Sequence, residues 1–270
     1  MKIFAIKNPD LGKDVDLGYF FYYDKLDDCY IELNDTLDAW DFPFILDSFA
    51  KQNRWVVNQK YTRLFISQRI IPSDRQNIGM ILKDNGLEVY DEIQLFLLAD
   101  GRCAQDECYI KQIPFEQLPL NIRKRRKRMI VSAKNISAGR YLVGFVDNKI
   151  GLWEADRCAF ISRQVRRLLT YKNRLSALQA VSSGFELRWD EDAAGISYDA
   201  VYENCEFLPV DMESLERFTI GNLVTTQDII NEMGCTRQNI NDHVKRGRIR
   251  SVDLNAKTQI FSRREYQKLL

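Results

Sequence analysis

Two helix starts separated by a glycine constrain the last fifty residues, 221–270, more tightly than any other feature of the chain. The stretch Thr225–Asp228 has the form of a capping box, in which a threonine oxygen and a carboxylate bond the free amides at a helix start. Gly234 supplies the positive φ that a tight turn needs, and Thr236 is expected to cap a second helix. This order predicts two short helices joined by a tight turn.

Apolar residues in this segment recur at helical spacing, which marks the sides of the two helices that pack inward. They are Ile229, Ile230 and Met233 in the first helix, and Ile240 and Val244 in the second. The run Lys-Arg-Gly-Arg-Ile-Arg at 245–250 ends the second helix with basic side chains and a glycine stop. Val252 and residues 260–261 are expected in two strands of a small wing, and 262–265 has the form of another capping box.

The outward face of the predicted second helix carries side chains that suit DNA. Arg bonds the two acceptors of guanine in the major groove, and Gln or Asn bonds the acceptor and donor of adenine. Three residues are therefore expected to contact bases: Arg237, Gln238 and Asn241. Five are expected to contact the phosphate backbone, which positions a protein without specifying sequence: Thr236, Lys245, Arg246, Arg248 and Arg250. The alternative is a protein-docking module with a solvated basic face.

The stretches Val224–Ile230, Gly234–Gln238 and Lys245–Ile249 resemble the winged helix-turn-helix of excisionases and MerR-type regulators. The resemblance covers about fifty residues and implies that this segment binds double-stranded DNA. Two positions depart from the family pattern, because Ile230 replaces a small residue and His243 is more polar than a packing position requires. These departures imply a different helix crossing within the same fold.

Charge is distributed unevenly along the chain, although the formal net charge of the 270 residues is only +1. Residues 1–113 contain thirteen basic and nineteen acidic side chains, whereas the remainder contains twenty-six and nineteen. An acidic front and a basic back fit a protein that presents only its C-terminal part to nucleic acid. We expect three domains: an α+β domain over 1–113, an α+β domain over 114–220, and the helix-turn-helix over 221–270.

The fold class expected is therefore α+β, with two small mixed α/β domains before the C-terminal module. Strands are predicted at 2–6, 17–22, 29–33, 141–146, 150–153, 178–181 and 184–189, and helices at 41–50, 73–85 and 163–169. The order of elements over about 130–210 resembles a small uncharacterised bacterial domain family associated with toxin–antitoxin loci. That resemblance implies a bacterial or phage origin and transfers no active site.

Six consecutive basic residues open the middle segment: Arg123, Lys124, Arg125, Arg126, Lys127 and Arg128. Such a run is expected to be exposed. It either adds contacts to the phosphate backbone or forms an ordinary solvated surface, and the sequence leaves both readings open.

Few residues suit catalysis or metal binding. His243 is the only histidine, no glycine-rich phosphate loop is present, and Cys103 and Cys108 lack two further zinc ligands. We therefore expect no catalytic residue, no metal and no cofactor. Three acidic clusters keep a metal-dependent nuclease open as an alternative: Asp10, Asp14 and Asp16; Asp27 and Asp28; and Asp190, Glu191 and Asp192. The absence of a signal peptide or a long apolar run predicts a cytoplasmic protein with reduced thiols and no membrane contact.

Together these features predict a sequence-specific DNA-binding protein, a bacterial or phage transcriptional regulator. Its N-terminal domains would serve dimerisation, partner binding or sensing, because one small helix-turn-helix buries too little surface for specific affinity and such modules commonly act as homodimers. A second reading is a protein-interaction component of a toxin–antitoxin or phage-defence system, whose acidic N-terminal domain binds a basic protein partner.

Overall fold

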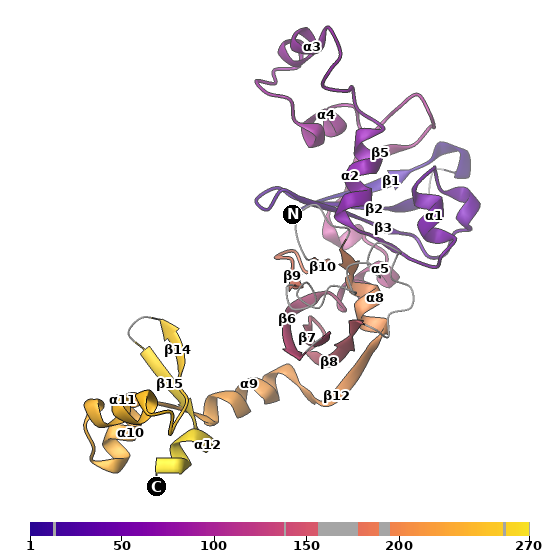
Figure 1. The fold of residues 1–270 in the computed structure, drawn as a ribbon. Helices are drawn as coiled ribbons and strands as arrows, with labels where there is room; N and C mark the ends of the chain where they lie inside the picture. The colour runs from indigo at the N-terminus through magenta and orange to yellow at the C-terminus, as the bar shows by residue number, and fades with distance from the viewer. Residues whose placement is uncertain (13–14, 138, 156–177, 189–194, 256–257, 270) are drawn as a thin grey trace. The chain divides into compact units, whose positions relative to one another are not determined.

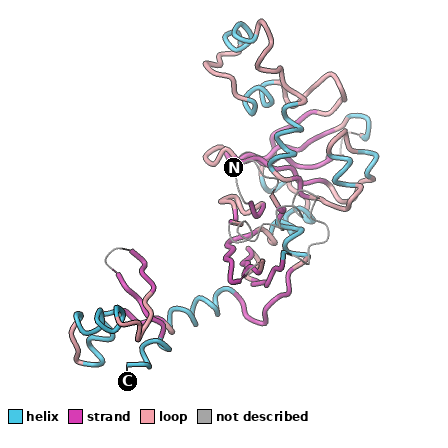
Figure 2. Tube along the Cα trace, in the orientation of Figure 1, coloured by secondary structure: helices cyan, strands magenta, loops and turns pink. Residues whose placement is uncertain are grey.

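The computed structural model describes residues 1–12, 15–137, 139–155, 178–188, 195–255 and 258–269. The fold is mixed α+β and is built on several antiparallel sheets (Figures 1 and 2). The chain divides into two compact units, Met1–Leu208 and Pro209–Leu270. None of the described helices combines the length and apolar character needed to cross a membrane.

A five-stranded sheet forms the centre of the first unit, with the strand order β4-β3-β2-β1-β5. Its strands are β1 (Lys2–Lys7), β2 (Asp16–Tyr23), β3 (Asp28–Leu33), β4 (Val56–Val57) and β5 (Tyr109–Gln112). The three strands predicted near the N-terminus are therefore confirmed. Gly18 of β2 is required by close packing, because a Cβ at this position would lie 2.5 Å from the carbonyl oxygen of Glu32 on β3.

Both faces of this sheet are buried, which explains why its strands carry long apolar runs instead of simple alternation. One face, which includes Phe4, Phe20 and Ile31, packs against helices of the first hundred residues (Figure 1). The helical segments of this stretch are η1 (Pro9–Leu11), η2 (Ala39–Asp41), α1 (Leu46–Ala50), α2 (Gln59–Ser67), α3 (Ile78–Asp84) and α4 (Glu92–Leu98). Of these, α1, α2 and α4 contribute buried side chains.

The opposite face packs against the segment that follows residue 113. Tyr19, Phe21 and Tyr30 share one apolar cluster with Trp153 and Phe185 from the later part of the chain. The elements of this part are η3 (Phe115–Gln117), α5 (Leu120–Arg126), β6 (Ile130–Ser137), β7 (Arg140–Phe145), β8 (Lys149–Glu154), β9 (Gln179–Ala180), β10 (Glu186–Arg188), β11 (Ile196–Ser197), α8 (Tyr198–Glu203) and β12 (Cys205–Asp211). Residues on both sides of the expected boundary at 113/114 thus contribute to one core.

Two smaller sheets complete the first unit, with the orders β12-β8-β7-β6 and β11-β10-β9. The predicted hairpin of β7 and β8 is confirmed, and its turn places Asn148 at a positive φ of 70°. Strands were also expected around β9 and β10, and both are present in shorter form. The helix predicted at 163–169 lies outside the described residues.

Two predicted helices begin later than expected. The helix expected from residue 41 starts at Leu46, after a short 3-10 turn and after Ile45, whose φ is 79°. The helix expected from residue 73 starts at Ile78, and the apparent capping box before it forms a turn instead. In both cases the local signal at the start was wrong by several residues.

The second unit contains four helices, three strands and a final turn among its described residues. They are α9 (Met212–Gly221), β13 (Leu223–Thr225), α10 (Thr226–Met233), α11 (Arg237–Lys245), β14 (Val252–Asn255), β15 (Thr258–Ser262), α12 (Arg263–Tyr266) and η5 (Gln267–Leu269). The strands form a sheet in the order β13-β15-β14. Their core is small: Val224, Ile229, Ile240, Ile249, Phe261 and Tyr266. The expected boundary at 220/221 falls at the end of α9.

A buried ionic cluster joins α5 to β3 in the first unit. Glu32, which is fully buried, accepts a hydrogen bond from Arg126 Nη1 at 3.0 Å, and Arg125 Nε lies 3.9 Å from its second oxygen. Burial lowers the pKa of Arg126, but the charge of Glu32 and the interactions with Tyr23 together raise it more, so its pKa lies above the ordinary value. The Arg126 guanidinium also lies 4.1 Å from the ring centroid of Phe21. This cluster fixes α5 on the sheet.

Replacement of Arg126 by Leu should therefore destabilise the first unit by about 3 kcal/mol, because it leaves a buried carboxylate with one distant partner. All four tryptophans of the chain lie within residues 1–208, so urea unfolding followed by tryptophan fluorescence reports on this unit alone. Lys124→Leu on the same helix is the matched control, because Lys124 is exposed and its loss should change stability by less than about 0.5 kcal/mol. Equal effects of the two substitutions would contradict the role of the cluster.

Candidate nucleic-acid interface

Helix α10 is fixed at both ends by local interactions. At its start the Asp228 N–H donates to Thr225 Oγ1 at 3.2 Å, and the Thr225 N–H donates to Asp228 Oδ2 at 2.7 Å. The predicted capping box is therefore confirmed. At its end Gly234 adopts a φ of 65°, and its N–H donates to the Ile230 carbonyl at 2.9 Å. A glycine without a Cβ takes this left-handed conformation at no steric cost, so the chain turns sharply into the next helix.

Helix α11 is also capped at both ends. Thr236 Oγ1 accepts a hydrogen bond from the Asn239 N–H at 3.3 Å, as predicted. At the C-terminal end the Gly247 N–H donates to the Val244 carbonyl, and the Arg248 N–H donates to the His243 carbonyl. With Gly247 at a φ of 68°, this pair of bonds forms a Schellman motif. Between the caps Ile240 is fully buried and anchors the helix in the core.

The three residues expected to contact bases lie within the first five positions of α11. Arg237 and Gln238 are exposed, and Asn241 is half-buried. Arg237 and Asn241 are four residues apart, which places them on the same side of a helix, with Gln238 next to Arg237. The structure therefore brings these side chains together in the first turns of α11, with Gln238 the one turned most nearly away from the buried Ile240.

A nearby carboxylate holds one of these side chains, which the sequence reasoning did not anticipate. Gln238 Nε2 donates to Asp242 Oδ1 at 3.2 Å. This bond leaves the carbonyl oxygen and one amide hydrogen of Gln238 for another partner. The spacing of four residues between Gln and Asp on a helix was the signal that could have revealed it.

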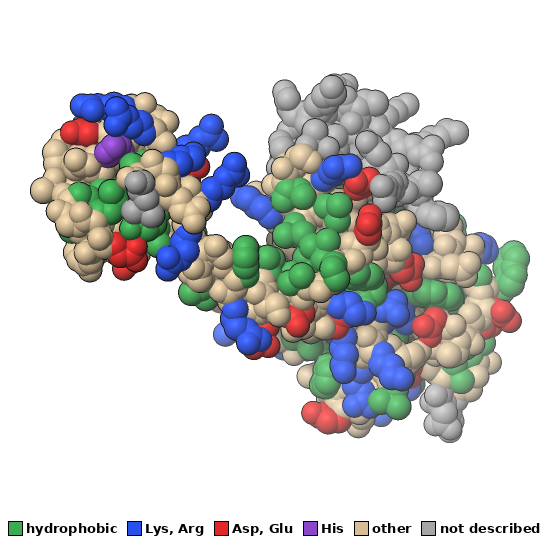
Figure 3. All heavy atoms as spheres, turned by 90° about the horizontal axis from the view of Figure 1, so that it is seen from below, with side chains coloured by type: hydrophobic (Ala, Val, Ile, Leu, Met, Phe, Trp, Pro, Cys, Tyr) green, Lys and Arg blue, Asp and Glu red, His purple; other side chains and the backbone are tan. Residues whose placement is uncertain are grey.

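The five residues expected to contact phosphate are exposed and frame α11 at its two ends. Thr236 lies at the start, Lys245 and Arg246 at the end, and Arg248 and Arg250 on the segment that leads to β14. The turn at Gly247 separates Arg246 from Arg248. In the space-filling view, Lys and Arg side chains gather beside the single histidine, which marks the last part of α11 (Figure 3).

The hairpin after α11 is also present as predicted. Strands β14 and β15 pair antiparallel, with Val252 opposite Ile260. The Arg250 N–H donates to Glu265 Oε2 at 2.9 Å, which connects the start of this hairpin to α12. Ser262 caps α12 by accepting from the Glu265 N–H at 3.2 Å.

The basic run at 123–128 does not form a continuous exposed surface, so that expectation is wrong. Arg125 and Arg126 are buried against Glu32, and Arg123 and Arg128 are half-buried. Arg128 Nη1 lies 3.8 Å from Glu203 Oε1. Only Lys124 and Lys127 are exposed among the six. Arg125, Arg126 and Arg128 thus take part in packing, because each contacts partners that are distant in sequence.

Most described carboxylates of the acidic clusters considered for nuclease chemistry are held by cations or hydroxyls. Lys7 and the Tyr19 hydroxyl both donate to Asp16, whereas Asp14 lies outside the described residues. Asp27 Oδ2 lies 2.8 Å from Arg63 Nη2, and Asp28 Oδ2 accepts from Ser183 Oγ at 3.2 Å. The cluster Asp190–Asp192 lies outside the described residues. Within the described ranges no group of three His, Cys, Asp or Glu side chains is placed to bind a metal ion.

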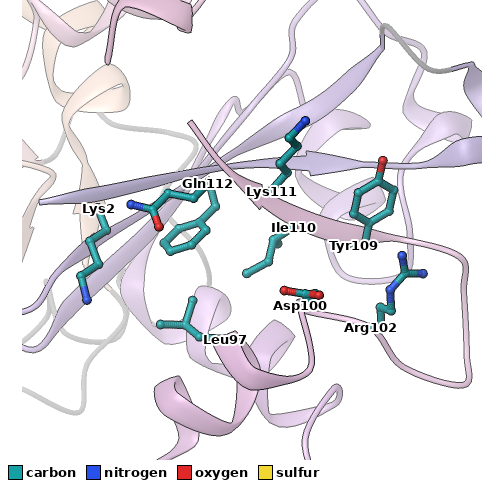
Figure 4. A pocket seen from close by; sticks show the side chains of 9 residues that line it. Lys2, Leu97, Asp100, Arg102, Tyr109, Ile110, Lys111 and Gln112 are labelled. Carbon is teal, nitrogen blue, oxygen red and sulfur yellow. The ribbon is translucent and has the colours of Figure 1, made fainter. Parts of the chain in front are cut away.

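A shallow depression of about 500 Å³ lies at the outer edge of β5 (Figure 4). Leu97 and Ile110 lie between Lys2 at one end and Asp100 and Arg102 at the other. Its rim carries both signs of charge, and no residue that the sequence indicated for DNA contact lines it. The depression therefore adds nothing to the candidate interface.

Comparison of the chain with protein-family models, with curated proteins and with solved structures finds no match. Any assignment of function therefore depends on the residues and geometry described above.

A second buried carboxylate distinguishes the first unit and is sensitive to pH. Glu186 on β10 accepts from Arg188 Nε at 2.6 Å, and Arg188 Nη2 also donates to the Tyr30 hydroxyl at 3.2 Å. Gly195 permits this packing, because a Cβ there would lie 2.3 Å from Glu186 Cδ. Burial raises the pKa of Glu186 to about 7, although Arg188 lowers it. Glu186 therefore binds a proton more tightly in the folded protein than in the unfolded chain.

Because the folded protein binds this proton more tightly than the unfolded chain does, the free energy of unfolding depends on pH. The contribution of Glu186 to stability is fully present below its ordinary pKa of 4.5 and is lost as pH rises through about 7. Gln at this position has no proton to lose, so Glu186→Gln removes this pH dependence. The free energy of unfolding of the variant, relative to that of the parent, should therefore rise by on the order of 2 kcal/mol as the pH increases from 4.5 to about 7. Tryptophan-detected urea unfolding at a series of pH values measures the difference. Parallel stability curves for the two proteins would disprove it.

Proposed function

We propose that the chain is a sequence-specific DNA-binding protein whose segment 221–270 is a winged helix-turn-helix. In this reading α10 and α11 are the helix pair, α11 enters the major groove, and β14 and β15 are the wing. The observation that carries the proposal is the start of α11, where Arg237 and Gln238 are exposed and Asn241 is half-buried, while the buried Ile240 holds the helix in the core. An α-helix fits the major groove with its first turns against base edges.

The distribution of cations supports this reading. Exposed Lys245, Arg246, Arg248 and Arg250 follow directly after the side chains assigned to bases. Cations placed beside a groove-facing helix bond phosphates and set its register on the duplex. The Schellman turn at Gly247 fixes the directions in which Arg246 and Arg248 leave the helix. A transcriptional regulator of bacterial or phage origin is the class of protein that this combination fits best.

The direct test is fluorescence anisotropy of the purified chain with a duplex from the region upstream of its own coding sequence, and with a scrambled duplex of equal length. Both titrations are repeated at several salt concentrations, since phosphate contacts make the affinity fall as salt rises. Tight binding to the upstream duplex and weak binding to the scrambled one is the expected result. Equal weak binding to both would rule out sequence recognition.

Arg237→Ala should weaken binding to the preferred duplex by about 1–3 kcal/mol and relax the preference at one base pair. The reason is the loss of a two-bond contact between the guanidinium and guanine. Binding to duplexes with each base pair replaced in turn measures both effects. An unchanged preference at every position would remove Arg237 from the set of base contacts.

Arg248→Ala should instead weaken binding to all duplexes alike and reduce the steepness of the salt dependence by about one charge. Its side chain is assigned to phosphate, which carries no sequence information. Lys83→Ala is a control of equal charge change, because Lys83 is exposed but lies in the first unit, outside the basic run. A change in sequence preference on loss of Arg248 would place this side chain against a base.

A further inference from the structure

A carboxylate lies on the side of α11 that is turned farthest from the core. Gln238 and Asp242 each lie two residues from the buried Ile240, about 200° around the helix. Lys245 follows on the same side, about 140° from Ile240. Because a carboxylate repels the phosphates of DNA, its presence on this side needs a physical reason if α11 enters the major groove.

Asp242 determines which end of the Gln238 amide stays available to a ligand. Gln238 Nε2 donates to Asp242 Oδ1 at 3.2 Å. A carboxylate accepts hydrogen bonds but does not donate them, so the amide nitrogen of Gln238 faces Asp242 and its oxygen faces away. The available edge of the amide then presents the Oε1 acceptor beside the remaining N–H donor. Without the carboxylate, the amide is free to turn over and present both N–H groups instead.

The two orientations of this amide fit different bases. In the major groove adenine presents a donor, its N6 amine, beside the N7 acceptor, whereas guanine presents two acceptors, N7 and O6. An acceptor beside a donor matches adenine, but against guanine it brings Oε1 to O6, where two acceptors meet. Two N–H donors match guanine. The orientation that Asp242 holds is therefore the one that discriminates adenine from guanine.

We propose that Asp242 is a positioning residue that makes Gln238 select adenine over guanine at one base pair. The inference rests on the proposed function, because it requires α11 to lie in the major groove. The negative charge of Asp242 also weakens binding to every duplex, since it lies near the phosphates. Asp242 thus lowers the overall affinity for DNA while it raises the discrimination between sequences.

Fluorescence anisotropy of the full chain, with duplexes in which each base pair of the preferred sequence is replaced in turn, tests this inference. Gln238→Ala identifies the base pair that Gln238 contacts, because the preference is lost at that position. There the parent chain should bind the adenine duplex at least about tenfold more tightly than the guanine duplex. Asp242→Ala should reduce this ratio by at least about threefold, because one oriented hydrogen bond is lost. It should also tighten binding to the scrambled duplex.

Two controls separate the orientation of Gln238 from the charge of Asp242. Glu216→Ala removes one negative charge from an exposed position of the same unit, so it should leave every base preference unchanged. In a chain that already carries Gln238→Ala, Asp242→Ala should have no further effect on base preference, because the side chain through which it acts is absent. Circular dichroism checks that all variants keep the helix content of the parent.

Four results would overturn the inference while the proposed function stands. They are a base other than adenine at the position of Gln238, a ratio that Asp242→Ala leaves unchanged, an equal change of the ratio with Glu216→Ala, and a preference lost at a different base pair. The last result would place Asp242 itself against a base. In all four the parent chain still prefers the upstream duplex to the scrambled one. Equal weak binding of the parent chain to both duplexes would instead remove the proposed function and this inference together.

Discussion

Burial of both faces of the five-stranded sheet is the constraint on which the larger unit depends. Along β1 the side chains of Ile3, Phe4, Ala5 and Ile6 are all buried, so neither face of this strand is left for water. Helices α1, α2 and α4 cover one face, whereas among the described residues the other face is covered by the part of the chain after 113. Residues 1–113 alone would expose a whole aromatic face, which explains why one core spans the two expected N-terminal domains.

The same constraint accounts for the buried charges. Segment 114–208 must close over the sheet, and α5 does so by placing two guanidiniums against Glu32. Such a cluster adds little stability compared with an apolar contact of equal size. Its buried charges must meet, however, and this requirement sets the position of α5 relative to β3. A run of basic residues, which by composition suits a solvated surface, thus becomes part of the packing between segments about ninety residues apart in sequence.

Local signals predicted the C-terminal elements well because their causes are local. The capping box at Thr225, the turn at Gly234 and the stop at Gly247 each depend on residues within five positions, so the sequence contains the whole interaction.

The box at residue 73 failed because a cap favours a helix but cannot supply burial, and α3 buries none of its residues. The burial of Arg126 could not be predicted from local sequence, because its partner Glu32 lies 94 positions away. For the candidate interface, sequence identified the outward side chains, whereas the bond from Gln238 to Asp242 emerged only from the structure.

The two units therefore differ in how much stability their own apolar cores can supply. The first closes a large core, whereas the described core of the second has six buried residues in a segment of roughly sixty. Segments of that size usually need a metal, a disulfide or a partner to be stable. The described cysteines are free, so no disulfide among them supplies this stability. Ile240 is the one fully buried residue of α11, and the exposed residues at its start and end are accessible to a ligand. Any ligand that binds only the folded unit stabilises it by mass action. In the proposed complex, DNA against α11 would thus add to the stability that the small core provides, and recognition and folding of this unit would be coupled.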